Sequence, residues 1–260
     1  GIAKDFGDLI AGGNQIRGVS SSTRGVFLGG RRPHPGVVNT MDFITIANTA
    51  NALDFGDLLT GRGAVGEISS QTRGIAAAGY NPGGTNTIEF ITIATLGNSQ
   101  DFGDTLSAGS AMAGTQSSTR GILAGNYAPS SPNTSNVIQF LTIASQGTDA
   151  SDFGDTTNAA EGYLACASNT RGIFVGGNVS PSGNVNTIQF ITIASEGNAT
   201  DFGDIGSNRV TAQSGAGTSN NLRGVTMGGF NNPNQYSTTM EFVNIATTGN
   251  SNDFGYLTSS

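Results

Sequence analysis

The sequence has no tryptophan, one cysteine, one histidine and one lysine. A single cysteine, Cys166, excludes an intramolecular disulfide, and we expect its thiol to be buried and unreactive. The single histidine, His34, excludes a multi-histidine metal site and nearly excludes a histidine-based catalytic triad. With 18 acidic residues and a net charge of −7, the chain has no basic patch, so we expect no nucleic-acid partner.

Long apolar runs are also missing. No segment approaches the roughly 18 apolar residues of a membrane helix, so we expect no membrane insertion. The amino terminus carries no signal peptide and no initiator methionine and begins almost inside a repeat, so we expect a trimmed chain or a piece of something longer.

Glycine is abundant, with 40 residues. Hydrophobic residues make up 36% of the chain, and they fall in regular β-branched runs. This composition favours many short strands with tight turns over disorder.

Three motifs recur in the same order five times, which makes internal repetition the strongest signal in the sequence. The first is an Arg-Gly step followed by an apolar run. The second is a stretch of the type Thr-Ile-Glu/Gln-Phe-Ile-Thr-Ile-Ala. The third is Asp-Phe-Gly-Asp, which becomes Asp253-Phe254-Gly255-Tyr256 in the last copy.

Each repeat reads as four short strands separated by turns of Gly, Asn, Pro and Ser, with essentially no helix. In the third strand, for example 88–94, apolar residues occupy both alternating sets, so both of its faces should be covered. Blades of a propeller pack face to face and meet this requirement, whereas a two-layer sandwich, the alternative fold, leaves a polar outer face. We therefore predict an all-β fold, a five-bladed β-propeller of four-stranded blades.

The predicted propeller is one domain over residues 1–260, with repeat units at about 10–59, 60–106, 107–157, 158–206 and 207–258. Residues 1–9 hold a sixth Asp-Phe-Gly-Asp, which is a spare copy of the fourth strand. The strands at the two termini would then compete for one place. Either one copy lies along the outer edge of the last blade as a fifth strand, or one pairs with another subunit or a flanking domain.

A repeat of about 50 residues with two glycines ending its second strand resembles a kelch repeat. The pairs Gly29-Gly30, Gly176-Gly177 and Gly228-Gly229 carry this resemblance, and the chain departs from it at Ala78-Gly79 and Ala124-Gly125 and in lacking tryptophan. The whole unit is also similar to repeats in proteins of marine bacteriophages. That similarity implies a virion or other extracellular structural protein.

The Asp-Phe-Gly motif is not a kinase motif here, since the phosphate loop, strand lysine and catalytic loop of kinases are missing. We predict a structural latch in which the repeated arginine pairs with an aspartate of Asp-Phe-Gly-Asp. A Ca²⁺ site at the clustered carboxylates is the alternative. The latch residues are Arg24, Arg73, Arg120, Arg171, Arg223, Asp54, Asp101, Asp152, Asp201 and Asp253.

Loops of variable length follow the second strands, at 31–38, 80–85, 126–136, 178–186 and 230–237. They should share one face of the propeller with the connections from fourth to first strands. Aromatic rings flanked by Asn and Ser suit stacking on a sugar, although such loops can also be merely tolerant surface. The candidate ligand-binding residues are Tyr80, Asn81, Tyr127, Phe230 and Tyr236.

We predict no enzymatic activity, no catalytic residue, no metal and no cofactor. The acidic residues Asp42, Glu89 and Glu241 occupy one repeat position, so we interpret them as architecture. The predicted function is a structural or adhesive module of a virion tail or other extracellular assembly. It would contact other copies of itself or other structural proteins. A glycan-binding propeller that recognises cell-surface glycans is the alternative.

Overall fold

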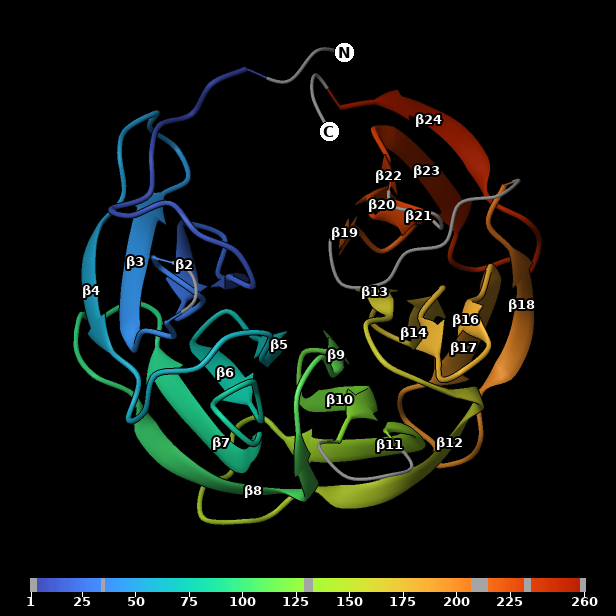
Figure 1. The fold of residues 1–260 in the computed structure, drawn as a ribbon, viewed down its shortest axis with the longest axis horizontal. Coiled ribbons are helices and arrows are strands. Elements are labelled where there is room, and N and C mark those ends of the chain that lie inside the picture. Colours follow the sequence, from blue (N-terminus) through green and yellow to red (C-terminus); the bar gives the residue numbers. More distant parts are fainter. Residues whose placement is uncertain (1–3, 34–35, 129–132, 207–214, 232–234, 258–260) are drawn as a thin grey trace.

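The computed structural model describes residues 4–33, 36–128, 133–206, 215–231 and 235–257. This part of the chain contains five four-stranded antiparallel sheets, arranged as the blades of a propeller (Figure 1). The predicted five-bladed, all-β fold is therefore confirmed. The described residues form no helix, and hence none long and apolar enough to cross a membrane.

Each blade is a meander in which consecutive strands pair, with the first strand near the centre of the ring and the fourth at its rim (Figure 1). Blade 1 holds β1 (Arg17–Ser20), β2 (Arg24–Leu28), β3 (Thr40–Thr45) and β4 (Leu53–Asp57). Blade 2 holds β5 (Gly66–Ser69), β6 (Arg73–Ala77), β7 (Thr85–Thr92) and β8 (Gln100–Gly109). Blade 3 holds β9 (Ala113–Gln116), β10 (Arg120–Tyr127), β11 (Thr134–Thr142) and β12 (Ser151–Ala160).

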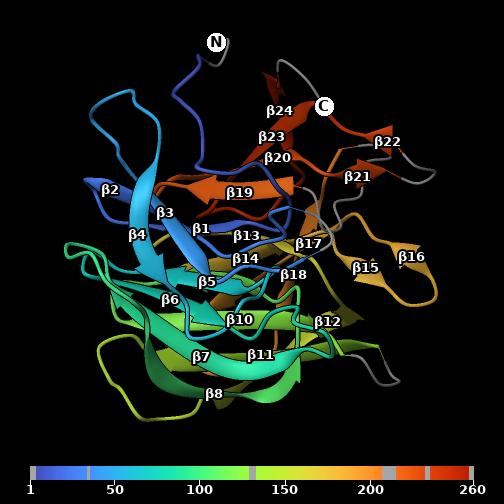
Figure 2. The same cartoon turned by 60° about the vertical axis from the view of Figure 1, so that its left-hand side comes forward.

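Blade 4 holds β13 (Leu164–Ala167), β14 (Arg171–Val175), β17 (Thr187–Thr192) and β18 (Thr200–Asp204). Blade 5 holds β19 (Gly215–Ser219), β20 (Arg223–Gly228), β23 (Thr239–Asn244) and β24 (Asn252–Tyr256). Two small hairpins project from the loops after the second strands of these blades (Figure 2). They are β15 (Asn178–Val179) with β16 (Gly183–Asn184), and β21 (Phe230–Asn231) with β22 (Gln235–Tyr236).

The glycine of the Asp-Phe-Gly motif has a positive φ angle in every blade. Gly56 has φ 138° and Gly103 has φ 144°, values that residues with a side chain rarely adopt. A Cβ on Gly103 would also lie 2.6 Å from the carbonyl oxygen of Thr148 in the next blade. In blades 1 to 4 the motif is therefore the place where the fourth strand approaches the backbone of the following blade.

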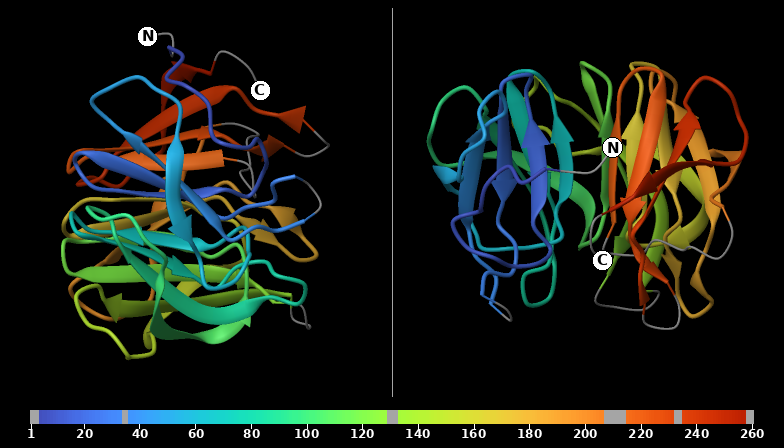
Figure 3. Two further views of the ribbon diagram at one scale, coloured as in Figure 1. Left: turned by 90° about the vertical axis from the view of Figure 1, so that its left-hand side faces the viewer. Right: turned by 90° about the horizontal axis from the view of Figure 1, so that it is seen from above.

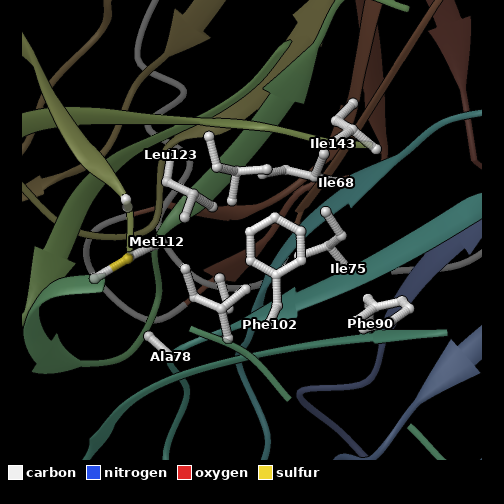
Figure 4. Close-up of a cluster of buried hydrophobic side chains, with 12 residues drawn as sticks. Ile68, Ile75, Ala78, Phe90, Phe102, Met112, Leu123 and Ile143 are labelled. Atoms are coloured by element: carbon white, nitrogen blue, oxygen red, sulfur yellow. The ribbon is translucent and has the colours of Figure 1, made fainter. Parts of the chain in front are cut away.

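The hydrophobic core is divided among the junctions between blades. Figure 4 shows Ile68, Phe90 and Phe102 of blade 2 packed with Leu123 and Ile143 of blade 3. The rings of Phe90 and Phe102 meet edge to face, with centroids 6.2 Å apart. Ile91 packs in the core between blades 1 and 2, so both faces of β7 are covered, as its sequence predicted.

The ring is open between blade 1 and blade 5, and the first and last described segments, 4–10 and β24, lie beside this opening (Figures 1 and 3). The spare segment 4–10 does not add a fifth strand to blade 5, whose sheet has the order β19-β20-β23-β24. It lies instead on blade 1, where the Asp8 amide donates to Asn51 Oδ1 at 2.9 Å and the Ala52 amide donates to the Asp8 carbonyl at 2.8 Å. The two fourth-strand copies therefore occupy different places and do not compete.

Candidate functional site

The repeated arginine joins neighbouring blades, but not through aspartate. In each blade its guanidinium lies over the phenylalanine of the third strand, as for Arg73 over Phe90 at 4.5 Å from the ring centroid. The same guanidinium reaches the next blade, where Arg73 donates to the carbonyls of Ile143 and Ser145 at 2.9 and 2.7 Å. The prediction of an Arg–Asp latch was therefore wrong about the partner of the arginine. The other stacked pairs are Arg24–Phe43, Arg120–Phe140, Arg171–Phe190 and Arg223–Phe242.

The predicted aspartate partners lie on the surface. All five are exposed, and none forms an ion pair among the described residues: Asp54, Asp101, Asp152, Asp201 and Asp253. In an exposed position the carboxylate keeps its hydration, whereas the planar guanidinium gains more by stacking on a ring. The described part of the chain also brings no three His, Cys, Asp or Glu side chains together in a way that could hold a metal ion.

The fourth strands of blades 1 to 4 each form hydrogen bonds with the next blade. The Asp57 amide of blade 1 donates to Asn98 Oδ1 of blade 2 at 3.0 Å, and the Ser99 amide donates back to the Asp57 carbonyl at 2.9 Å. Asp104, Asp155 and Asp204 repeat this arrangement at the three following junctions. We call the blade surface that packs on the next blade the leading face, and the surface that packs on the preceding blade the trailing face.

The acidic position in the third strand is part of the same junction. Glu89 Oε2 accepts the Leu59 amide at 2.9 Å, and Gln139 Oε1 accepts the Leu106 amide at 2.9 Å. Glu89 also pairs with Arg62 at 2.9 Å, and both side chains are fully buried. Burial lowers the pKa of Arg62, and the Glu89 carboxylate opposes that shift. These contacts support the interpretation of this position as architecture.

The two faces beside the opening have no blade to cover them. On the trailing face of blade 1, Ile46 is 44% exposed, whereas Ile93, Ile143, Ile193 and Ile245 at the same repeat position are at most 3% exposed. On the leading face of blade 5, Phe254 is 49% exposed, whereas Phe102 is fully buried. Arg223, unlike the other four repeated arginines, finds no carbonyl acceptor among the described residues of another blade. The opening therefore exposes two apolar surfaces that the other junctions bury.

One end of the propeller, which we call a mouth, contains two of the predicted ligand-binding residues. Tyr80 and Tyr127 line a pocket of about 310 Å³ together with Arg17, Arg31 and Glu161. They are brought there by β-bridges that pair Tyr80 with Gly63 and Tyr127 with Ser110. The loops after second strands and the fourth-to-first connections therefore do share one end of the propeller, as predicted. Arg31 lies over the ring of Tyr80 at 4.2 Å, so one face of that ring is already covered.

The remaining predicted ligand-binding residues lie elsewhere. Phe230 and Tyr236 pair edge to face on the β21–β22 hairpin, with centroids 5.5 Å apart. Asn81 forms a turn, in which its carbonyl accepts the Gly84 amide at 2.7 Å. The structure therefore brings Tyr80 and Tyr127 into one pocket and Phe230 and Tyr236 onto one hairpin. His34 lies outside the described residues.

The opposite mouth was not predicted. It is a polar bowl of about 1070 Å³ lined mainly by the turns between first and second strands, at 20–22, 69–73, 114–119, 165–169 and 217–221. Neighbouring turns are joined by hydrogen bonds, such as the Ser22 amide to Gln71 Oε1 at 3.0 Å and the Asn169 amide to Asn221 Oδ1 at 3.2 Å. The repeated Ser, Thr, Gln and Asn of these turns were the signal that could have revealed it.

Two titratable groups of the inner strands have shifted pKa values. Burial raises the pKa of the Glu67 carboxyl, and Arg17, 3.9 Å away, opposes the shift. Desolvation raises the pKa of Cys166 to about 12, which favours the neutral thiol. The prediction that Cys166 is buried is confirmed.

Comparison of the chain with models of protein families finds no match, and comparison with curated protein sequences finds none either. The class that the structure defines is that of the five-bladed β-propellers, and the two mouths and the opening are its candidate sites.

Proposed function

We propose that the protein is a non-catalytic structural module that joins other polypeptides through the two apolar faces at the ring opening. The observation that carries this proposal is the exposure of Ile46 and Phe254, whose repeat equivalents are buried at the four complete junctions. Exposed apolar surface with the geometry of a buried interface is typical of a protein–protein contact. The similarity to bacteriophage repeats favours a virion or another extracellular assembly as the setting.

The solution mass tests this proposal. Light scattering over a concentration series is expected to show growth beyond the mass of one chain, because each copy offers both an exposed leading face and an exposed trailing face. Ile46→Lys and Phe254→Lys should keep the protein monomeric. Leu96→Lys is the matched control, because Leu96 is also exposed but belongs to blade 2, away from the opening. A single-chain mass at every concentration for the unmodified protein would contradict the proposal.

Glycan binding is a second candidate, supported by the shared pocket of Tyr80 and Tyr127. Tyr127, which is 39% exposed, and the polar groups of Arg17 and Glu161 suit a sugar with its hydroxyls. A glycan array with Tyr127→Ala tests this function, and Tyr236→Ala on the separate hairpin is its control. The absence of binding to any sugar would set this candidate aside.

A further inference from the structure

Residues 4–10 lie on blade 1 as the fourth strand of a preceding blade would. The Asp8 amide and carbonyl bond to Asn51 and Ala52, just as Asp57 bonds to Asn98 and Ser99 one junction later. The Ile10 amide donates to Asp42 Oδ2 at 3.3 Å, which matches the bond from Leu59 to Glu89. A Cβ on Gly7 would lie 2.4 Å from the Ala50 carbonyl oxygen. At the next junction, a Cβ on Gly56 would lie 2.5 Å from the Gly97 carbonyl oxygen.

This fourth strand does not belong to blade 5. Blade 5 has its own fourth strand, β24, which pairs with β23 from Thr239↔Tyr256 to Phe242↔Asn252. No hydrogen bond among the described residues joins β24 to blade 1. Segment 4–10 therefore lies where a fourth strand would lie, but it pairs with no third strand among the described residues.

The side chains around the opening define what those three strands must carry. Phe55, Phe102, Phe153, Phe202 and Phe254 each meet a third-strand phenylalanine edge to face, but Phe6 has no ring partner among the described residues. On the side of blade 1, Ile46 lacks the covering that a repeated arginine and its phenylalanine give to Ile93. On the side of blade 5, Phe254 lacks the aliphatic cover that blade 3 gives to Phe102.

We propose that the opening accepts one additional blade, formed by a three-stranded antiparallel sheet of this same repeat type, with residues 4–10 as its fourth strand. The partner carries Phe and Arg on the side that meets blade 1 and an Ile-x-Ile pair on the side that meets blade 5. Residues 4–10 complete it by strand addition, which gives register through the main chain and specificity through alternate side chains. The inference rests on the proposed function and names its partner.

The test repeats residues 159–200 directly before Asp5, so that the copied first three strands run into the native segment 5–10. Hydrogen exchange at residues 6–10, 45–46 and 253–256 is expected to slow by about tenfold or more relative to the original chain, because these amides become part of a closed junction. The extended chain should also stay monomeric at concentrations at which the original chain associates.

The matched control is the same extended chain with Phe190→Asp and Ile191→Asp in the added copy, which should leave those amides unprotected. Protection of β8 amides verifies that the original blades are folded. If the extended chain does not fold, residues 159–200 added as a separate polypeptide to the original chain must produce the same slowing. Unchanged exchange at 6–10 and 45–46 in that mixture, or in a folded extended chain, would overturn the proposal.

The two proposals fail separately. Unchanged exchange in the presence of self-association of the original chain would refute the additional blade and leave the assembly function standing. Unchanged exchange with a strictly monomeric original chain would refute both.

Discussion

Ile46 and Ile93 hold the same position in consecutive repeats, yet Ile46 is 44% exposed and Ile93 is 1% exposed. The difference comes from the neighbouring blade and not from the residue, because Ile93 lies under blade 1 and Ile46 has no blade over it. Equivalent residues in this chain therefore form matched pairs, in which one member reports a complete junction and the other the opening.

Phe102 and Phe254, both from the Asp-Phe-Gly motif, are the first such pair. Phe102→Ala should lower the free energy of unfolding by about 3–5 kcal/mol, because it leaves a cavity in a closed core. Phe254→Ala should cost less than about 1 kcal/mol, because the ring is half exposed already. Urea unfolding of both variants measures the difference, and equal losses would contradict an open ring.

The repeated arginine is the second pair. Arg73→Met should lower the free energy of unfolding by about 2 kcal/mol, since it removes a ring contact and hydrogen bonds to two carbonyls of blade 3. Arg223→Met should cost less than about 1 kcal/mol, because only the contact with Phe242 is lost. Chemical unfolding again provides the comparison. A larger effect at Arg223 would mean that blade 5 is covered in solution.

Glycine of the inner strands is the third pair. A Cβ on Gly114 would lie 1.8 Å from the Glu67 carbonyl oxygen of the preceding blade, so Gly114→Ala should cost about 2 kcal/mol or more. Gly18 holds the same repeat position beside the opening, where the nearest atom is 3.8 Å away. Gly18→Ala should therefore change the free energy of unfolding by no more than about 0.5 kcal/mol. Thermal unfolding distinguishes the two, and a strongly destabilised Gly18→Ala would indicate a closed ring.

Glu67 should make stability depend on pH. Its folded pKa is raised above the ordinary value of 4.5, so the folded state binds its proton more tightly than the unfolded state does. The protein then loses stability as the pH rises from 4.5 through the raised pKa. Glu67→Gln should unfold at a higher temperature than the original protein at neutral pH, and this advantage should disappear below pH 4.5. An advantage that is constant with pH would show that the effect is not titration.

Cys166 should report global unfolding. With a pKa of about 12 and a buried sulfur, the thiol should not react with an alkylating reagent in the folded protein at mildly alkaline pH. It should react at once in denaturant. Rapid alkylation under native conditions would show that β13 and β20 separate locally, since the Cys166 sulfur packs against Gly224 of β20.

The sequence predicted the blades because each strand has its own local signature. It also predicted that the loops carrying Tyr80 and Tyr127 share one face of the propeller, because consecutive strands alternate in direction. The partner of the repeated arginine could be predicted only with knowledge of the strand register. Arg73 lies opposite Thr92 and Ile75 lies opposite Phe90, so Arg73 is the diagonal neighbour of Phe90. Without that register, the abundant aspartates were the obvious partners for arginine.

The opening between blades 1 and 5 could not be predicted from the sequence, for a different reason. Blades 1 and 5 carry the same motifs as the internal blades, so no local pattern marks their outer faces as exposed. Only the placement of segment 4–10 on blade 1, with β24 retained by blade 5, distinguishes them.

The position of the first and last described segments also has a mechanical consequence. Segment 4–10 and β24 both lie beside the opening, so tension applied between them acts on the bonds that hold residues 4–10 to blade 1 and β24 to β23 (Figure 1). The cores between blades bear that load only after one of these segments has peeled away. We therefore expect a short, extensible first stage under force, followed by the stiff resistance of stacked sheets.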